Sequence, residues 1–322
     1  MRAIRRFALC LFASFAVTSH AEDKITFVTS WYAEAEHGGF YQALAEGTYR
    51  KYGLDVTIRM GGPQVNAYQL LLAGQADLAM GYDIQTLKAV EQGLPLVSVG
   101  AVFQQDPAVL IAHPDVTSIA DLKTRTLLIG QTSETTFWPW LKTKFGFNET
   151  QKRPYAFSVQ PFLADTNIAQ QGLATSEPYA IEKAGIKPRV FLLADAGYPP
   201  YAETLVTTHK VLQARPDVIR RFVAATAAGW KSYLQNPLPG NALIRKENPQ
   251  IEPELLAYGV AKMKQYALVT GGDARTQGIL TMTDARWQQT RDFLVRSNLL
   301  RADVDVKKAY RLDLLPVPAV LP

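Results

Sequence analysis

Aromatic, acidic and hydroxyl side chains gather in four segments of the sequence, and each segment follows a predicted β-strand. The first, residues 30–39, contains Trp31, Tyr32, His37 and Gly39. Open α/β sheets bind ligands outside the carboxyl ends of their strands, so these residues are candidates for a ligand site. The two aromatic rings provide stacking surfaces, and Gly39 would let helix amides approach a ligand closely. Alternatively, Trp31 packs in the core and His37 caps a helix.

The second segment, residues 81–83, places Tyr82 and Asp83 at the end of another predicted strand. The Asp83 carboxylate could accept hydrogen bonds from a ligand amine. The same side chain could instead cap the helix that follows it, and the two roles are compatible.

The third segment, residues 130–136, brings Thr132, Ser133 and Thr136 to a strand end together with helix N–H groups. Such a turn suits a carboxylate, sulfonate or phosphate. Ser133 alone is also an ordinary N-cap residue. Pro139 lies inside the predicted helix, so the helix is either kinked or begins later.

The fourth segment consists of residues 175–179 and the later residues 197–201, with Glu177 and Tyr198 as the candidates. Glu177 precedes a proline and is predicted to be extended, which would direct its carboxylate toward a ligand. The alternative is a solvated surface acid. Tyr198 either lines the site or packs at a hinge, and the sequence does not separate these roles.

Sequence motifs for catalysis are missing. The chain has no G-x-S-x-G, H-E-x-x-H, Walker or G-x-G-x-x-G pattern. His37, His113 and His209 lie far apart, without metal-ligand spacing. We therefore predict a binding protein without a metal or cofactor rather than an enzyme.

The elements that would position these segments alternate as in an α/β protein. Strands are predicted at residues 25–29, 56–59, 78–81, 96–103, 126–129, 155–159 and 189–193. Helices are predicted at residues 37–52, 65–73, 84–92, 118–122, 134–145, 162–171, 216–235, 252–265 and 285–297.

The chain is too long for one core, so we expect two α/β lobes with a cleft between them. Lobe 1 is predicted to contain residues 22–112 and 202–322, including a helical C-terminal part, and lobe 2 to contain residues 113–201. The chain would cross between them near Ala112 and near Tyr201. Such a two-crossing hinge lets the lobes close on a ligand.

The N-terminus predicts export. Arg2, Arg5 and Arg6 precede an apolar run at residues 7–17, and a segment of small residues ends at Ala21. This is the pattern of a signal peptide cleaved after Ala21, which implies a periplasmic protein. The apolar run is too short to cross a bilayer.

The charge balance argues against polyanionic partners. Loss of the three signal-peptide arginines lowers the formal net charge from +5 to about +2 (31 basic and 29 acidic residues). Without a long run of like charges, neither nucleic-acid nor membrane-surface binding is indicated. We expect a monomer.

A family resemblance is carried by five stretches of this sequence: residues 37–43 (HGGFYQA), 47–56 (GTYRKYGLDV), 74–79 (GQADLA), 118–123 (SIADLK) and 197–201 (GYPPY). Together they resemble the NMT1/THI5-like (SsuA/THI5) solute-binding family. The resemblance implies a type II periplasmic-binding-protein fold and a small-molecule ligand delivered to the permease and ATPase of an ABC importer. Family ligands include thiamine-pyrimidine precursors, riboflavin, sulfonates, nitrate and aromatic acids, so the resemblance does not fix the solute.

The same family suggests two alternatives. One is a thiamine-pyrimidine synthase using pyridoxal phosphate, which needs a lysine and a histidine one helical turn later. In the matching stretch, residues 81–87, Asp83 replaces the lysine and no histidine follows. Pyrimidine-binding relatives also carry a Trp-x-Pro-Asn start, where this chain has Trp31-Tyr32-Ala33-Glu34. The other alternative is a periplasmic sensor subunit that docks on a receptor.

Overall fold

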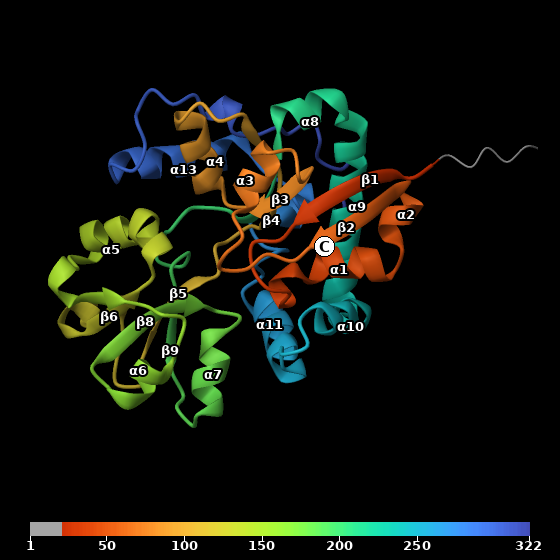
Figure 1. Ribbon diagram of the computed structural model, residues 1–322. Helices are drawn as coiled ribbons and strands as arrows, with labels where there is room; N and C mark the ends of the chain where they lie inside the picture. The colour runs from red at the N-terminus through yellow and green to blue at the C-terminus, as the bar shows by residue number, and fades with distance from the viewer. Residues whose placement is uncertain (1–20) are drawn as a thin grey trace, which may run out of the picture.

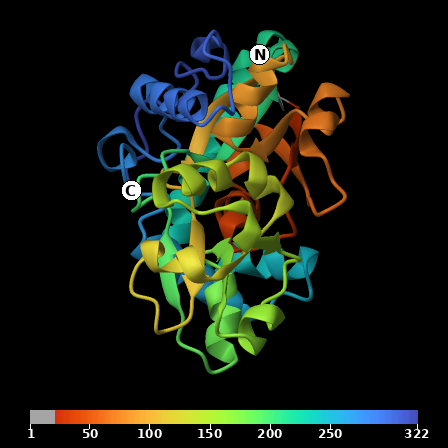
Figure 2. The same ribbon diagram turned by 90° about the vertical axis from the view of Figure 1, so that its left-hand side faces the viewer.

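The computed structural model describes residues 21–322 and contains two five-stranded sheets, each covered by helices (Figure 1). The strand order is β2-β1-β3-β10-β4 in the first sheet and β7-β6-β8-β5-β9 in the second. Figure 2, in which the left-hand side of Figure 1 faces the viewer, shows the yellow-green second lobe in front of the first. Residues 1–20, which hold nearly all of the predicted signal peptide, lie outside the described residues.

The strands run in mixed directions. The first sheet consists of β1 (Asp23–Val28), β2 (Leu54–Arg59), β3 (Leu78–Gly81), β4 (Leu96–Phe103) and β10 (Ala202–Thr208). The second consists of β5 (Ala108–Ala112), β6 (Thr126–Ile129), β7 (Lys152–Pro154), β8 (Ile168–Leu173) and β9 (Arg189–Leu192). In each sheet one strand beside a crossing is antiparallel to its neighbours: β10 to β3 and β4, and β5 to β8 and β9.

Most helices belong to the first lobe. They are α1 (Gly38–Ala45), α2 (Thr48–Lys51), α3 (Ala67–Leu72), α4 (Asp83–Glu91), α8 (His209–Ala214), α9 (Pro216–Gln235), α10 (Leu238–Glu247), α11 (Pro253–Gln265), α12 (Ala274–Gln277) and α13 (Asp284–Arg296). The second lobe has α5 (Phe137–Phe145), α6 (Gln160–Ala164) and α7 (Glu177–Lys183). Short 3-10 helices are η1 (Ala35–His37), η2 (Ile119–Thr124), η3 (Gln131–Thr135), η4 (Glu149–Gln151) and η5 (Val306–Lys308). Within residues 21–322, no helix combines the length and apolar character needed to cross a membrane.

The core of the first lobe lies between its sheet and α9. Phe27 on β1 contacts Phe40 of α1 and Phe222 of α9, with ring centroids 4.5 and 5.5 Å apart. The α9 helix carries a buried face that includes Trp230 and ends at Tyr233, and both side chains are fully buried. Burial of this face fixes α1, and thereby the loop between β1 and α1, against the sheet.

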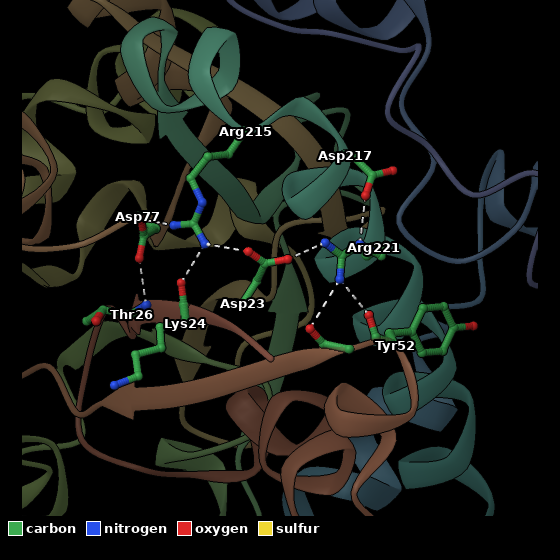
Figure 3. Close-up of polar contacts among 9 residues, drawn as sticks. Asp23, Lys24, Thr26, Tyr52, Asp77, Arg215, Asp217 and Arg221 are labelled. Atoms are coloured by element: carbon green, nitrogen blue, oxygen red, sulfur yellow. Dashed lines mark hydrogen bonds and ion pairs between the residues drawn. The ribbon is translucent and has the colours of Figure 1, made fainter. Parts of the chain in front are cut away.

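Two arginines near the start of α9 hold the first residue of β1 in place (Figure 3). Arg221 donates to Asp23 at 2.6 Å and to Asp217 at 2.8 Å, and Arg215 donates to Asp77 at 3.2 Å. The same guanidinium groups also reach the carbonyl oxygens of Lys24, Tyr52 and Gly53. The Arg221 hydrogen bond holds the pKa of the Asp23 carboxyl below its usual range. The β1 strand is therefore anchored two residues after the predicted cleavage position.

The first crossing lies earlier in the chain than predicted. Residues Ala108–Ala112 form β5 and pair with β8 and β9, so they belong to the second sheet. The chain therefore passes between the sheets after Phe103 rather than near Ala112. It returns between Leu192 and Ala202, because β10 pairs with β3 and β4.

Three other local predictions were wrong. The helix predicted at residues 37–52 is divided, because Gly47 adopts a left-handed φ of 66° between α1 and α2. The strand predicted at residues 155–159 is a loop, since β7 ends at Pro154. The helix predicted at residues 162–171 stops at Ala164 and is followed by β8. Pairing of β8 between β6 and β5 overrides the helical spacing of its apolar residues.

Candidate functional site

An aromatic pair links the two lobes at the end of β1. The Trp31 ring lies 5.6 Å from the Phe157 ring with a tilt of 34°, and 5.5 Å from Tyr32 in an edge-on arrangement. Trp31 is half-buried, and Phe157, in the loop after β7, remains 67% exposed. Phe157 also has a left-handed φ of 55°, which is unusual for an aromatic residue. An exposed ring held in this conformation opposite Trp31 indicates a recognition surface between the lobes.

Glu177 extends this aromatic row into the second lobe. Its Oε1 accepts a hydrogen bond from the Tyr155 hydroxyl at 3.0 Å, and its Oε2 accepts one from the Leu173 amide at 2.7 Å. Tyr155 lies 5.4 Å from Phe157. Trp31, Phe157, Tyr155 and Glu177 therefore form one row across the boundary of the lobes.

The predicted extended conformation of Glu177 was wrong, because this residue begins α7. Pro178 occupies the first helical turn, where a residue without an N–H group loses no intrahelical hydrogen bond. The turn brings the Glu177 carboxylate back to the end of β8. Proline disfavours a helical conformation at the residue before it, but only as a preference. Here Glu177 is helical, and its carboxylate accepts the hydrogen bond from the Leu173 amide at the end of β8.

Polar contacts also join the lobes. The Thr175 hydroxyl, after β8, donates to the Glu36 carboxylate on η1. Farther out, Lys183 and Tyr179 on α7 donate to Glu252 at 2.7 and 2.8 Å, just before α11. These contacts join the end of β8 to η1, and α7 to the residue before α11, and Figure 1 shows α7 and α11 on facing sides of the boundary.

Five carboxyl groups near the boundary of the lobes are close enough to influence one another's ionisation. They belong to Glu34 and Glu36 in the loop after β1, Asp106 in the first crossing, Glu177 on α7 and Glu203 on β10. Glu36, Asp106 and Glu203 are 3%, 6% and 5% exposed, whereas Glu34 and Glu177 keep part of their surface open to solvent. Within residues 21–322, none of these five carboxyl groups forms an ion pair.

The titration of these groups reflects their burial and their mutual repulsion. Burial, followed by the charges of Glu36, Glu203 and Glu177, holds the pKa of the Glu34 carboxyl well above its usual range. Burial and the charges of Glu36 and Asp106 do the same to the pKa of Glu203. Burial raises the pKa of Asp106 to about 6. A carboxyl group that lacks a cation nearby resists ionisation in this way.

Glu203 has two further unusual features. Its Oε2 is buried and has no hydrogen-bond partner among the described residues. Its backbone adopts a left-handed φ of 52° at the point where β10 leaves the second crossing. A buried orphan acceptor is unfavourable by about 1–3 kcal/mol, and backbone strain adds to this. Both features at one residue are typical of a position that meets a ligand.

Tyr82 borders the acidic cluster, whereas the neighbouring Asp83 does not. Burial and the charges of Glu203 and Asp106 hold the pKa of the Tyr82 hydroxyl well above its usual range. Tyr82 is half-buried and precedes α4 as its N-cap residue. Its proximity to these carboxyls keeps it in the proposed site.

Asp83 has a structural role instead of the expected ligand contact. It is fully buried, and its carboxylate accepts hydrogen bonds from the Ile84 amide (2.7 Å), the Tyr201 amide (2.9 Å) and the Thr290 hydroxyl (2.9 Å). These bonds tie α4 to the second crossing and to α13. Burial raises the pKa of Asp83 to about 7. Because both carboxylate oxygens accept hydrogen bonds from within the protein, we exclude Asp83 from the proposed site.

His37 and Gly39 are also placed by packing. His37 is fully buried, neither ring nitrogen has a partner among the described residues, and burial lowers its pKa to about 3, so the ring is neutral. It does not cap α1 through its side chain. A Cβ on Gly39 would lie 2.2 Å from the Trp230 ring. Close packing of α1 on α9, rather than approach of a ligand, therefore explains this glycine.

The hydroxyl turn of the third segment forms η3, and α5 begins only at Phe137. Thr132 is exposed, Ser133 is buried and Thr136 is half-buried. The Thr136 hydroxyl is 3.4 Å from the carbonyl oxygens of Thr132 and Ser133 and donates within the turn. No side chain caps α5. An anion site at Thr132, Ser133 and Thr136 remains a prediction.

Tyr198 packs at the hinge. It is buried, and its ring lies 5.4 Å from Trp140 on α5 and 5.4 Å from Phe293 on α13. Of the two roles left open by the sequence, hinge packing accounts for these contacts. Within residues 21–322, no group of three or more His, Cys, Asp or Glu side chains is arranged to hold a metal ion.

Comparison with known proteins identifies the family. The model of the family described as NMT1/THI5 like matches residues 34–238, more than half of the chain. The chain belongs to this family. The matched residues include every member of the acidic cluster.

Two binding proteins match most of the chain, and an enzyme matches a small part of it. The riboflavin-binding protein RibY of Chloroflexus aurantiacus is 23% identical over 303 residues, covering 91% of this chain and 86% of RibY. The formylaminopyrimidine-binding protein of Halalkalibacterium halodurans is 24% identical over 267 residues, covering 77% and 80%. A 4-amino-5-hydroxymethyl-2-methylpyrimidine phosphate synthase of Aspergillus parasiticus matches only 83 residues, 26% of this chain and 24% of the enzyme, at 29% identity.

Among solved structures, the periplasmic aliphatic sulphonate binding protein SsuA from Escherichia coli has a TM-score of 0.68 at 15% identity. It covers 89% of this chain and 91% of SsuA. This similarity confirms the predicted periplasmic-binding-protein fold.

Proposed function

We propose that this protein is the solute-binding component of an ABC importer and that its two lobes close on one small organic molecule. The observation that carries the proposal is the row formed by Trp31, Phe157, Tyr155 and Glu177, which joins stacking rings to a carboxylate across the lobe boundary. The family relationship and the ligand-binding relatives support the same role. The partners would be the permease and ATPase of the importer, and the protein would act as a periplasmic monomer after loss of its signal peptide.

The site residues support binding rather than catalysis. General-base chemistry needs a group within hydrogen-bond reach of its substrate proton, but His37 is neutral, buried and without a carboxylate partner. The position at which a pyrimidine synthase would need its lysine is held by Asp83, whose oxygens are engaged by Tyr201 and Thr290. Both observations weigh against the synthase alternative.

The rings at the boundary favour a solute with a planar part. Stacking on Trp31 and Phe157 would contribute roughly 0.5–1.5 kcal/mol for each aromatic contact, beyond the area buried. The names of the relatives supply three candidate classes: a flavin, an aminopyrimidine and a sulfonate. An aromatic acid is a fourth.

Native mass spectrometry tests this function. Protein purified from the periplasm without unfolding is expected to carry one bound organic solute in a stoichiometric complex, and the Trp31→Ala variant is expected to lose it. The added solute should raise the melting temperature of the emptied protein. At a solute concentration of a hundred times its Kd, the free energy of unfolding should increase by about 2.7 kcal/mol. Absence of a copurified solute, together with no shift from any of the four classes, would contradict the proposal.

A further inference from the structure

The boundary between the lobes holds five carboxyl groups that no cationic side chain of residues 21–322 pairs with. Glu34, Glu36, Asp106, Glu177 and Glu203 come from four separate parts of the chain and converge there. Hydrogen bonds from Thr175, Tyr155 and the amides of Leu173 and Ala108 satisfy some of their oxygens. These donors are neutral groups of the protein, so they satisfy hydrogen-bonding capacity but supply no positive charge that would favour the ionised carboxylates.

Glu203 gives an independent indication that a ligand completes the cluster. Its buried Oε2 has no partner among residues 21–322, and its backbone is held in the left-handed region. Buried polar groups are almost always paired, so an orphan oxygen near the Glu34, Glu36 and Asp106 carboxyls calls for a hydrogen-bond partner from outside the chain. A protonated nitrogen would provide both the hydrogen bond and the opposite charge.

We propose that the solute is an organic cation, whose protonated nitrogen groups are held between the lobes by Glu203 together with Glu34, Glu36, Asp106 and Glu177. The inference rests on the proposed function, in that it assumes a solute bound between the lobes. It assigns the substrate class of that site.

An organic cation fits better than a metal ion or an anion. The described acidic side chains include no trio arranged to hold a metal ion, so a larger cation with several N–H donors is needed to reach them. Trp31 lies three residues before Glu34 and faces Phe157, and aromatic faces attract cations. A cation favours the ionised form of these carboxyls, whereas an anionic solute would find no opposite charge in the cluster.

Calorimetric titration of the emptied protein tests the charge of the solute. The cations are agmatine and spermidine, which carry protonated guanidinium and ammonium groups. The controls are taurine and benzoate as anions, riboflavin as a neutral solute, and calcium and zinc chlorides as metals. At least one organic cation is expected to bind more tightly than every control. Tighter binding of an anion, of riboflavin or of a metal, or no binding of any cation, would overturn the inference.

Two variants assign the binding to the cluster. Glu203→Gln keeps the shape of the side chain, and it is expected to weaken cation binding by about tenfold to a hundredfold, as for loss of one charged hydrogen bond. Glu34→Gln, in a loop outside the sheet, should also weaken cation binding. This variant tests the cluster even if the Glu203 variant does not fold. Glu254→Gln, the same change at an exposed position of α11, is the matched control and should leave affinity unchanged. Unchanged affinity in folded forms of both cluster variants would refute the assignment.

The two proposals fail differently. If native mass spectrometry finds a neutral or anionic solute that Trp31→Ala releases, the cation inference falls and the importer function stands. If no solute copurifies and none of the tested compounds binds, both fall.

Discussion

Replacing Asp83 with alanine separates a structural aspartate from a ligand-binding one. The change removes the acceptor for three donors: the Ile84 amide, the Tyr201 amide and the Thr290 hydroxyl. A buried donor left without a partner is unfavourable by about 1–3 kcal/mol. Loss of a buried carboxyl whose ionisation is itself unfavourable offsets part of this. We therefore expect the free energy of unfolding to fall by about 3–5 kcal/mol, toward the upper end of ordinary single substitutions.

The assay is urea unfolding of the solute-free protein, followed by circular dichroism, with solute affinity measured on the folded variant. Thr290→Val removes one of the three bonds and should cost about 1 kcal/mol, which provides an internal scale. Both variants should bind the solute with nearly unchanged affinity, because Asp83 faces α13 and the second crossing. A variant of Asp83 with normal unfolding but greatly weakened binding would refute this reasoning and return the residue to the ligand site.

Two further predictions concern the lobe boundary and its acids. Of the five tryptophans, Trp31 is the one that is partly exposed, so Phe157→Ala should increase acrylamide quenching of the tryptophan fluorescence. A double-mutant cycle of Phe157→Ala with Trp31→Ala should give a coupling free energy of about 0.5 kcal/mol or more. Unchanged quenching would contradict the contact between the two rings. Burial raises the pKa of Asp83 to about 7 and that of Asp106 to about 6 in the folded protein, from 3.8, so the folded state binds more protons. The solute-free protein should therefore lose on the order of 6 kcal/mol of stability as the pH rises from about 4 to 7. Urea unfolding across this pH range checks the sign, Asp106→Asn should flatten the dependence, and a rise in stability with pH would contradict it.

Local sequence signals predicted many elements correctly. The bounds of β3, β4, β6 and α9 agree with the predicted ranges. Each of these strands is a short apolar run with clear terminators, and α9 begins at a proline and repeats apolar residues at helical spacing. Such signals depend only on neighbours in the chain.

The second lobe was harder to predict because its central strands depend on distant partners. Both β5 and β8 lie inside the second sheet, and their pairing joins residues about 60 positions apart. The β8 sequence contains polar glutamines beside apolar residues, so its pattern resembled a helix end. Without β8 and the loop after β7, no local signal pointed to Tyr155 or Phe157 as site residues.

The sequence by itself determined the family, the two-lobed α/β architecture and the candidate segments at strand ends, including Trp31 and Glu177. Those features follow from local periodicity, turn residues and motif spacing, which are properties of neighbouring residues. Only the tertiary structure removed Asp83 from the site, by surrounding it with donors from the second crossing and α13. Only the tertiary structure joined Asp106 and Glu203 to the acids after β1, because each alone looks like an ordinary solvated carboxylate. Charge repulsion and desolvation act through space, so the chemistry of this cluster arises when the two crossings bring its members together.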